Sequence, residues 1–212
     1  MYQIISSGSH GNAVLYHNSI LLDCGISFQA VKPHIRDIQL LLLTHEHGDH
    51  INTNTVKRML AERPGLRIGC GEFMLDRLKG INHRNIDVYE AGKIYDYGLF
   101  KVSPIKLYHD VPNFGYRIFK GEHRLIHATD TFTLKGISAK GCDLYALEHN
   151  YNEDTVWDII REQEANGQFS HQRGSINSHL SKQQAQDFYL KNKSEHSQLI
   201  RLHESRTSRR LS

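Results

Sequence analysis

The strongest constraint on this chain is an apolar run that ends abruptly in histidine and aspartate side chains. Leu40–Leu43 are four consecutive leucines, and Thr44 is followed at once by His-Glu-His-Gly-Asp-His over residues 45–50. Consecutive leucines are typical of a strand that is buried on both faces. Imidazole and carboxylate groups extend such a strand poorly, because burying them without partners costs free energy. The sequence therefore predicts a buried strand that delivers a polar loop to the edge of a sheet.

The spacing within this loop fits the binding of two divalent ions. We expect His45 and His47, two residues apart, to chelate one ion, and Asp49 and His50 to point to the other side and hold a second. Imidazole together with carboxylate suits zinc, or manganese where oxygen ligands dominate. Gly48 is expected to supply the backbone freedom that so tight a loop needs.

Length and composition are those of one globular domain, which we expect to span residues 1–212. Hydrophobic residues make up 39% of the chain and charged residues 23%, close to the usage of soluble proteins. No apolar run approaches the roughly 20 residues needed to cross a bilayer. The N-terminal stretch "MYQIISSGSH" has neither the charged nor the apolar region of a signal peptide. We therefore expect a cytoplasmic protein without membrane contact.

The cysteines and the weak net charge further limit the classes of protein that fit this sequence. Cys24, Cys70 and Cys142 are odd in number and form no CxxC pair, so we expect buried free thiols, not a disulfide framework or a thiolate zinc site. The net charge is only +3, but arginines gather in the terminal "RTSRRLS". That tail either touches a phosphate backbone or is simply solvated, and composition alone leaves both open.

The order of expected elements favours a layered α/β or α+β sandwich in which helices cover sheets. Apolar and β-branched runs separated by turns predict strands at residues 2–6, 13–17, 20–25, 40–45, 66–70, 87–92, 100–109, 115–129, 142–150 and 198–203. Helical patterns cover residues 52–65, 72–80, 154–165 and 181–192. A hairpin is expected to turn at Lys120–Gly121, and Ser181 with Gln184 forms a capping box.

The loop at residues 45–50 resembles the HxHxDH signature of the metallo-β-lactamase superfamily. The resemblance implies an αββα sandwich of two mixed β-sheets covered by helices, with one or two metal ions at one edge of the sheets. It also asks for three later ligands, which match His109 in "IKLYHDVPNFGYRI", Asp130 in "LIHATDT" and His203 in "LIRLHESRTS". The last match is looser, since Glu204 stands where the family usually has a small or apolar residue.

Carried over residue by residue, the resemblance implies seven ligands to two divalent ions, with Zn²⁺ preferred over Mn²⁺. The first ion takes His45, His47 and His109, the second takes Asp49, His50 and His203, and Asp130 bridges them. Asp23 in "ILLDCG" matches the family's LLDxG strand and is expected to orient a ligand or the loop from behind. A purely structural Asp-Gly turn explains Asp23 equally well.

Two later segments resemble the ribonuclease Z group of this superfamily. His179 in "INSHLSKQQAQDF" matches the histidine of the HSTAxxA segment, and Glu148 in "ALEHNY" matches the glutamate of HEATF. The resemblance implies that His179 protonates the leaving oxygen while Glu148 holds it, with Asp49 as the third catalytic residue. A carboxylate beside an imidazolium raises its pKa, as a general acid requires. The alternative for His179 is a capping or packing role on its own helix.

The segments "SSGSHGNAVLY" and "LLDCGIS" are similar to those of the short, single-domain bacterial exonucleases of the YycJ/WalJ type. In that group the first segment lies near the site, which implies that Ser9, His10 and Asn12 offer donors to a phosphate. A tight turn alone also explains these residues. The length leaves no room for the arm with which ribonuclease Z enzymes grip tRNA, so DNA is favoured over tRNA.

The sequence thus predicts a two-metal phosphodiesterase, and specifically a nuclease or exonuclease acting on DNA or RNA. The alternative is a small-molecule phosphodiesterase that hydrolyses cyclic nucleotides with the same metals and acid. A non-catalytic binding module on a degenerate sandwich, and a thioester or lactam hydrolase that has no need of Glu148 and His179, are less favoured. A homodimer is compatible with the sequence.

Overall fold

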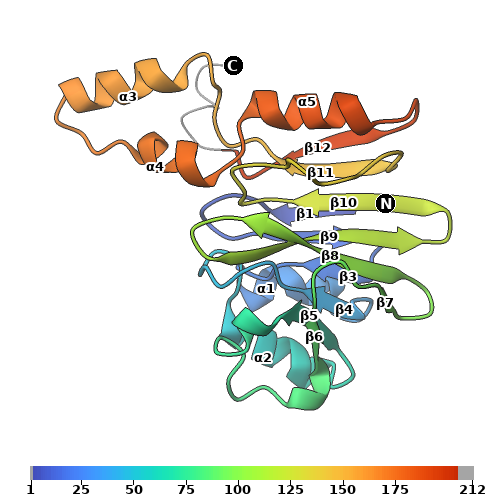
Figure 1. Ribbon diagram of the computed structural model, residues 1–212. Coiled ribbons are helices and arrows are strands. Elements are labelled where there is room, and N and C mark those ends of the chain that lie inside the picture. The colour runs from blue at the N-terminus through green and yellow to red at the C-terminus, as the bar shows by residue number, and fades with distance from the viewer. Residues whose placement is uncertain (1, 205–212) are drawn as a thin grey trace. The chain divides into compact units, whose positions relative to one another are not determined.

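The computed structural model describes residues 2–204, apart from the side chain of His171. The chain divides into two compact units, Met1–Glu90 and Ala91–Ser212, and each contains one six-stranded mixed sheet (Figure 1). A single domain over residues 1–212 stays a prediction. The arginines of the terminal "RTSRRLS" lie outside the described residues.

The sheet of the first unit brings three chain segments to one edge. Its strands are ordered β1-β2-β3-β4-β5-β6 and comprise Tyr2–Ser6, Ala13–Tyr16, Ile20–Leu22, Leu40–Leu42, Arg67–Gly71 and Ile86–Tyr89. Strand β2 is antiparallel to both neighbours, and β3 to β6 are mutually parallel. Strands β1, β3 and β4 therefore run the same way, so the segments that follow them emerge at the same edge.

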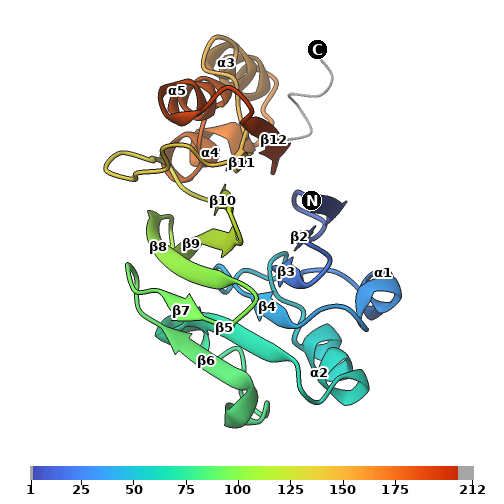
Figure 2. The ribbon, with the colours of Figure 1, turned by 90° about the vertical axis from the view of Figure 1, so that its right-hand side faces the viewer.

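Helices α1 (Phe28–Val31) and α2 (Thr53–Glu62) lie on the same face of this sheet (Figure 2). Leu41 and Leu43 are fully buried and belong to the same cluster as Phe28, Val56 and Met59. Replacing a buried leucine of this kind by alanine costs about 2–5 kcal/mol of unfolding free energy. The predicted buried strand is therefore confirmed over Leu40–Leu42, and it ends before the predicted residue 45.

The predicted helix after the polar loop is confirmed, and its ends are chemically defined. The side chain of Asn52 accepts a hydrogen bond from the backbone N–H of Thr55 at 3.1 Å and caps α2. The helix ends at Glu62, just before Pro64 and Gly65, which cannot readily continue it. The loop at residues 45–50 is thus held between a buried strand and a capped helix.

In the second unit, four strands end at one edge of the sheet. The order is β12-β11-β10-β9-β8-β7, comprising Gln198–Leu202, Leu144–Glu148, His123–Ala128, Pro112–Lys120, Lys101–Tyr108 and Tyr95–Asp96. Strand β9 is antiparallel to β8 and β10, while β10, β11 and β12 are parallel. Strands β8, β10, β11 and β12 therefore share a direction. The predicted hairpin is confirmed between β9 and β10, where Gly121 adopts a φ of 58°.

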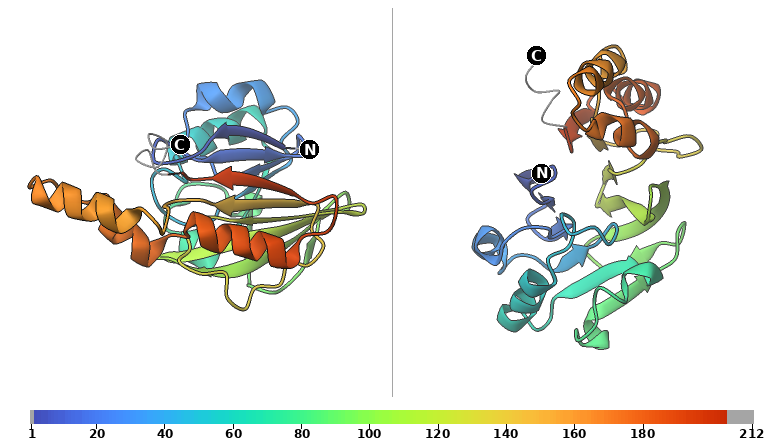
Figure 3. Two further views of the ribbon diagram at one scale, coloured as in Figure 1. Left: turned by 90° about the horizontal axis from the view of Figure 1, so that it is seen from above. Right: turned by 90° about the vertical axis from the view of Figure 1, so that its left-hand side faces the viewer.

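Between residues 91 and 204 the second unit has the helices α3 (Val156–Ala165), α4 (His171–Ser178) and α5 (Lys182–Asn192). Helix α5 covers the sheet, with Ala185 in one buried cluster with Tyr145 and Leu147. Its predicted capping box between Ser181 and Gln184 is present in both directions. Helices α3 and α4 extend outward from the end of the sheet at which β10, β11 and β12 finish (Figure 3).

Some elements differ from the sequence prediction. Residues 72–80, predicted as a helix, form a short 3-10 helix, Glu72–Met74, followed by turns. The 3-10 helix buries Met74 and the turns bury Leu78. Helix α4 was not predicted because its sequence "HQRGSINS" is polar and contains Gly174. It is held through Ile176, which packs on the cluster of Tyr151, Val156 and Ile160. No helix among residues 2–204 is long and apolar enough to cross a membrane.

Candidate functional site

His45, His47 and His50 lie in contact with one another in the loop that follows β4. His45 is fully buried, and its Nε2 lies 3.1 Å from Nδ1 of His47. The ring of His45 is also 4.1 Å, centroid to centroid, from the ring of His50. Nitrogens of neighbouring imidazoles at this distance share one proton, or both direct lone pairs toward the same cation. The loop therefore gathers imidazole nitrogens as a metal site requires.

Asp23 at the end of β3 holds His50 from behind. The Nδ1 atom of His50 lies 2.7 Å from Asp23 Oδ2, and both side chains are buried. Asp23 also accepts hydrogen bonds from the backbone N–H and the hydroxyl of Thr44. Burial raises the pKa of Asp23, while His50 and Thr44 act in the opposite direction. With Nδ1 engaged by the carboxylate, Nε2 is the atom of His50 that is placed to bind a cation.

Asn12 connects the β1–β2 loop to the ligand loop. Its Oδ1 accepts from the Gly8 N–H at 2.8 Å. Its Nδ2 lies 2.9 Å from His50 Nε2 and 3.3 Å from Asp49 Oδ2. Because an amide nitrogen can only donate, His50 accepts through Nε2, which agrees with donation from Nδ1 to Asp23. Asn12 therefore contacts two of the predicted ligands directly.

The other two predicted phosphate donors have a different environment. Ser9 and His10 are exposed in the turn between β1 and β2, where the Gly11 N–H donates to the Gly8 carbonyl at 3.0 Å. Asn12 is only 8% exposed. A role for Ser9, His10 and Asn12 in binding phosphate stays a prediction.

The glycine that this loop needs is Gly25, and the prediction for Gly48 is wrong. A Cβ atom on Gly25 would lie 1.8 Å from the carbonyl oxygen of Asp49, whereas one on Gly48 would meet no atom within 4 Å. Gly48 also does not have a positive φ. The tight element is the close approach of two backbones, since Cys24 N–H donates to the His50 carbonyl at 2.9 Å. A side chain at residue 25 would force them apart.

In the second unit, the fully buried carboxylate of Glu148 is surrounded by donors. Its Oε1 lies 2.6 Å from His179 Nδ1 and 3.1 Å from His203 Nδ1. Its Oε2 accepts from the backbone N–H groups of Leu180 and Thr131 at 3.1 and 3.2 Å. Burial alone would raise the pKa of Glu148, but His179 and then His203 outweigh it and the pKa lies well below its ordinary value. Glu148 is thus held as a carboxylate.

The contact with Glu148 shifts the pKa of His179 upward. Burial alone would lower the pKa of His179, but the charge and hydrogen bond of Glu148, together with Asp130, raise it above its ordinary value. The Asp130 carboxylate lies 3.6 Å from His179 Nδ1. With Nδ1 directed at Glu148, Nε2 is the atom of His179 left to exchange a proton with a substrate. The side chain is 17% exposed, so the ring is reachable from solvent.

Asp130 and His203 follow β10 and β12 and contact one another. His203 Nδ1 lies 3.1 Å from Asp130 Oδ1. Both residues have positive φ values, 55° and 50°, as does Asp23 at 59°. Such values cost free energy for residues other than glycine and persist where surrounding structure enforces them. Three predicted site residues thus share an uncommon backbone conformation at the ends of their strands.

His109 follows β8 and belongs to the same group. Its Nδ1 donates to the carbonyl of Ser178 at 2.9 Å, its Nε2 lies 3.0 Å from Asp110 Oδ1, and its ring is 5.0 Å from that of His179. Burial is the largest influence on His109 and lowers its pKa. With Nδ1 donating to the Ser178 carbonyl, the ring of His109 is held in one orientation and its Nε2 faces the Asp110 carboxylate.

Sequence reasoning did not single out two threonines that organise these groups. The hydroxyl of Thr44 lies within 3.3 Å of Asp23, His45 and His50. The backbone N–H of Thr131 donates to Glu148, and its hydroxyl accepts from the N–H of Tyr108. Thr44 and Thr131 each adjoin a predicted ligand, and that adjacency was the only signal in the sequence.

The side chains gathered in the second unit could either share a metal ion or hold one another through hydrogen bonds. One ligand atom from each of Asp130, Glu148, His179 and His203 lies within 4.8 Å of the others, which is close enough to share an ion. Both oxygens of Glu148 are, however, already accepting hydrogen bonds. That arrangement favours an orienting role for Glu148 over metal ligation.

Comparison with known proteins identifies the class. The β-lactamase superfamily domain matches residues 18–191, which is most of the chain, so the protein belongs to this superfamily. The exodeoxyribonuclease WalJ of Streptococcus pneumoniae serotype 2 (strain D39) is 26% identical over 178 residues, covering 73% of this chain and 64% of that protein. The exodeoxyribonuclease YycJ of Bacillus anthracis is 27% identical over 187 residues, covering 76% and 69%. The chain thus spans less than two thirds of the length of WalJ.

Solved structures agree on the fold. The metallo-β-lactamase fold protein YhfI from Bacillus subtilis matches with a TM-score of 0.72 at 16% identity, covering 96% of this chain and 85% of that one. Human tRNase Z, short form (ELAC1), matches with a TM-score of 0.69 at 16% identity, covering 98% and 93%. The chain therefore has the metallo-β-lactamase fold, an α/β sandwich with two mixed sheets. The predicted fold class and the resemblance to this superfamily are confirmed.

Proposed function

We propose that this protein is a metal-dependent phosphodiesterase that acts on nucleic acid, on DNA in preference to RNA, and from a strand end. The observation that carries the proposal is the contact between His179 and Glu148, which makes a buried carboxylate the partner of a reachable imidazole. The two relatives named exodeoxyribonucleases support DNA as the substrate. The superfamily itself supports hydrolysis with divalent ions.

The donors in both units fit zinc, and manganese as a second choice. We propose the ligands that the sequence predicts: His45, His47, Asp49 and His50 from the first unit with His109, Asp130 and His203 from the second. Nitrogen and carboxylate donors of this kind suit borderline divalent ions. The hydrogen bonds from His50 Nδ1 to Asp23 and from His109 Nδ1 to the Ser178 carbonyl fix the orientation of the two rings, and an ion at Nε2 would take the place of Asn12 Nδ2 at His50 and of Asp110 at His109. Bound divalent ions would supply Lewis-acid activation of water and of the phosphodiester.

His179 supplies the proton that the leaving oxygen needs. The contact with Glu148 raises the pKa of His179 and so favours the protonated imidazole that a general acid needs. Its Nδ1 stays with Glu148 while Nε2 delivers the proton, so donation does not break the contact that orients the ring. A proton at this atom matters most for an alkoxide such as the 3′ or 5′ oxygen of a nucleotide, because such a group leaves poorly without protonation.

Glu148 orients His179 and stabilises its charged form. The backbone N–H groups of Leu180 and Thr131 hold Oε2 of the carboxylate, while His179 contacts Oε1. Asn150 adds a longer contact, 3.3 Å from Nδ2 to Oε1. Because the N–H groups of Leu180 and Thr131 belong to the backbone, we expect Glu148 to keep its position when His179 loses its proton.

A panel of substrates tests the proposal. Protein loaded with Zn²⁺ or Mn²⁺ is incubated with end-labelled single- and double-stranded DNA, RNA and cyclic mononucleotides. We expect stepwise shortening of DNA from one end, with slower loss of RNA. If the protein cleaves cyclic nucleotides and leaves DNA and RNA intact, it is a small-molecule phosphodiesterase and not a nuclease. Protein that takes up no metal and cleaves nothing would indicate a binding module.

A further inference from the structure

Two exposed aromatic side chains lie next to the candidate ligands of the second unit. Tyr108 is the last residue of β8 and directly precedes His109, and Phe132 follows Asp130 by two residues. They are 45% and 43% exposed, and their ring centroids are 5.8 Å apart at an interplanar angle of 56°. Exposing two large rings side by side forgoes hydrophobic stabilisation. The pair therefore invites a functional explanation.

The position of this pair is tied to the His179–Glu148 contact by hydrogen bonds. The Phe132 N–H donates to the carbonyl of Tyr108 at 3.0 Å. The Tyr108 N–H donates to the hydroxyl of Thr131 at 3.1 Å, and the Thr131 N–H donates to Glu148 at 3.2 Å. A ligand that rests on the two rings is thus held at a defined distance from the proton donor.

A cation completes the arrangement. Residues alternate between the two faces of a strand, and Lys106 and Tyr108 are exposed on one face of β8 while Leu107 is buried on the other. The Nζ atom of Lys106 lies 5.9 Å from the centroid of the Tyr108 ring. Aromatic rings beside a positive charge are how proteins bind single-stranded nucleic acid, since every base offers a face for stacking and every link a phosphate.

We propose that Tyr108 and Phe132 form a stacking platform for a nucleobase of the strand being cleaved, with Lys106 contacting a neighbouring phosphate. The inference rests on the proposed nuclease function and adds recognition of the base to it. Stacking accepts any of the four bases, so the platform predicts digestion with little sequence preference. Tyr108 and Phe132 act in binding and take no part in the proton transfer.

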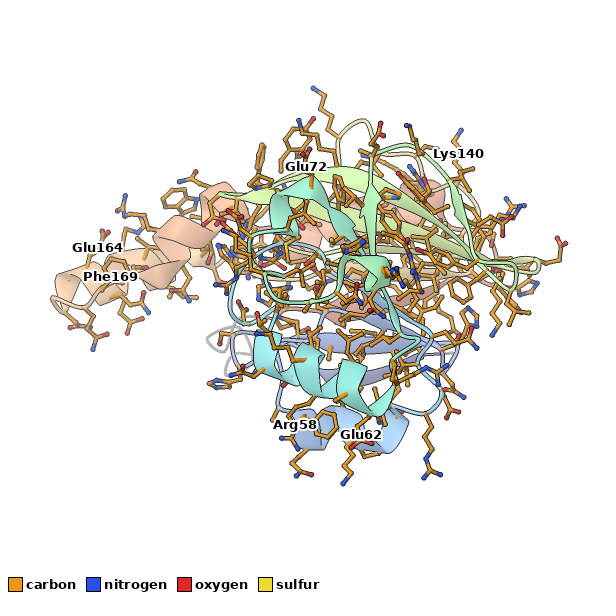
Figure 4. All side chains as sticks on the ribbon, turned by 90° about the horizontal axis from the view of Figure 1, so that it is seen from below. Arg58, Glu62, Glu72, Lys140, Glu164 and Phe169 are labelled. Carbon is orange, nitrogen blue, oxygen red and sulfur yellow. The ribbon has the colours of Figure 1, made fainter. Side chains whose placement is uncertain are left out.

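Other exposed aromatics serve as matched controls. Phe169 is 80% exposed and Trp157 is 55% exposed. Phe169 lies near Glu164 at the outer end of the α3–α4 pair (Figure 4). Neither residue adjoins a candidate ligand, so replacing Phe169 removes an exposed ring without touching the platform.

The test compares a normal oligodeoxynucleotide with one of equal length whose terminal residues are abasic. For the metal-loaded wild type, kcat/KM is expected to be about tenfold or more higher on the normal strand, because stacking is worth roughly that per base. The Tyr108→Leu, Phe132→Leu double variant is expected to bring this ratio close to one, mainly through KM. The ratio for Phe169→Leu is expected to match the wild type.

The ratio of kcat/KM on the normal and abasic strands distinguishes loss of the platform from a general loss of activity. A double variant that loses activity equally on both strands, or keeps the wild-type ratio, overturns the proposal. If the wild type cleaves neither strand, the nuclease function fails, and fluorescence anisotropy with the same labelled strands still tests the platform. In that case the platform is supported if the wild type binds the normal strand more tightly than the abasic strand and the double variant does not. Equal binding of both strands by the wild type overturns the platform.

Discussion

His179 Nδ1 lies 2.6 Å from Glu148 Oε1, although the two residues are 31 positions apart in the sequence. Strand β11 ends at Glu148, and His179 follows helix α4 directly. The contact shifts the two pKa values in opposite directions, upward for the imidazole and downward for the carboxylate. A buried carboxylate is tolerated here because it accepts from several donors at once.

Replacing the proton donor tests its role most directly. His179→Ala is expected to keep its bound metal and to lose about 10²–10⁴-fold of the rate on nucleic acid, the usual contribution of a general acid. The loss is expected to be much smaller on a p-nitrophenyl phosphodiester, because p-nitrophenolate leaves without a proton. Rates are measured on both substrates, with metal content by elemental analysis. Asp49→Ala serves as the contrast and is expected to lose metal, and equal metal loss in His179→Ala would show that His179 is a ligand.

Removing the charge of Glu148 shifts the pH dependence. A general acid works in its protonated form, so activity falls as pH rises through the pKa of His179. Glu148 raises that pKa, and Glu148→Gln is therefore expected to move the fall in kcat/KM to lower pH. The measurement is a pH–rate profile of both proteins on one DNA substrate. An unchanged alkaline limb would mean that another group donates the proton.

The contact of Asn12 with the ligand loop predicts an effect on metal binding. Asn12→Ala removes the donor to Asp49 Oδ2 and is expected to weaken zinc binding about tenfold or more, the usual effect of removing a group that orients a ligand. Zinc affinity is measured by competition with a chelator. Ser6→Ala is the control, since Ser6 Oγ donates to the Gly11 carbonyl at 2.5 Å in the same loop without touching a ligand. Equal zinc affinity in the two variants would limit Asn12 to shaping its turn.

Two glycines near the ligand loop are expected to respond very differently to the same substitution. Gly25→Ala places a Cβ 1.8 Å from the Asp49 carbonyl oxygen, so the backbones must separate. We expect it to lower the free energy of unfolding by more than about 2 kcal/mol, in the range of overpacked sites. Gly48→Ala has open space and is expected to change it by less than about 0.5 kcal/mol. Urea unfolding of both variants checks this, and similar losses would contradict it.

The predicted buried free thiols are confirmed, and their burial is expected to lower the stability of the fold at alkaline pH. Burial, aided by nearby carboxylates, raises the pKa of Cys24 and of Cys70 to about 12 from the ordinary 9.0. Above pH 9 the unfolded chain releases these protons and the folded chain retains them. The free energy of unfolding is therefore expected to fall by up to about 1.4 kcal/mol per pH unit for each thiol.

Thiol reactivity checks the same burial at milder pH. Cys142 is also buried, and its pKa is raised to about 11. At pH 8 the native protein is expected to leave all of its thiols unmodified by a disulfide reagent, and unfolding in urea to expose them together. Rapid modification of a thiol in the native state would contradict the burial described here.

Sequence reasoning succeeded where a local pattern carries the physics. The four leucines from Leu40 identify a buried strand whatever surrounds them, and the Ser181–Gln184 capping box needs only neighbouring residues. It failed for α4, whose polar sequence becomes helical because Ile176 packs on a cluster formed by α3 and Tyr151. It also chose Gly48 instead of Gly25, because a close approach between backbones 24 residues apart leaves no mark in a single sequence.

By itself, the sequence determined which side chains are available for chemistry, because HxHxDH and the later histidines and carboxylates are identities that folding does not change. Only the tertiary structure decided what each of them contacts. Strands β8, β10, β11 and β12 share one direction, and this brings His109, Asp130, Glu148 and His203 to one edge across nearly a hundred residues of chain. The same sheet edge sets Tyr108 and Phe132 beside them. Contacts of this kind depend on strand order and direction, which are properties of the folded sheet and not of any segment.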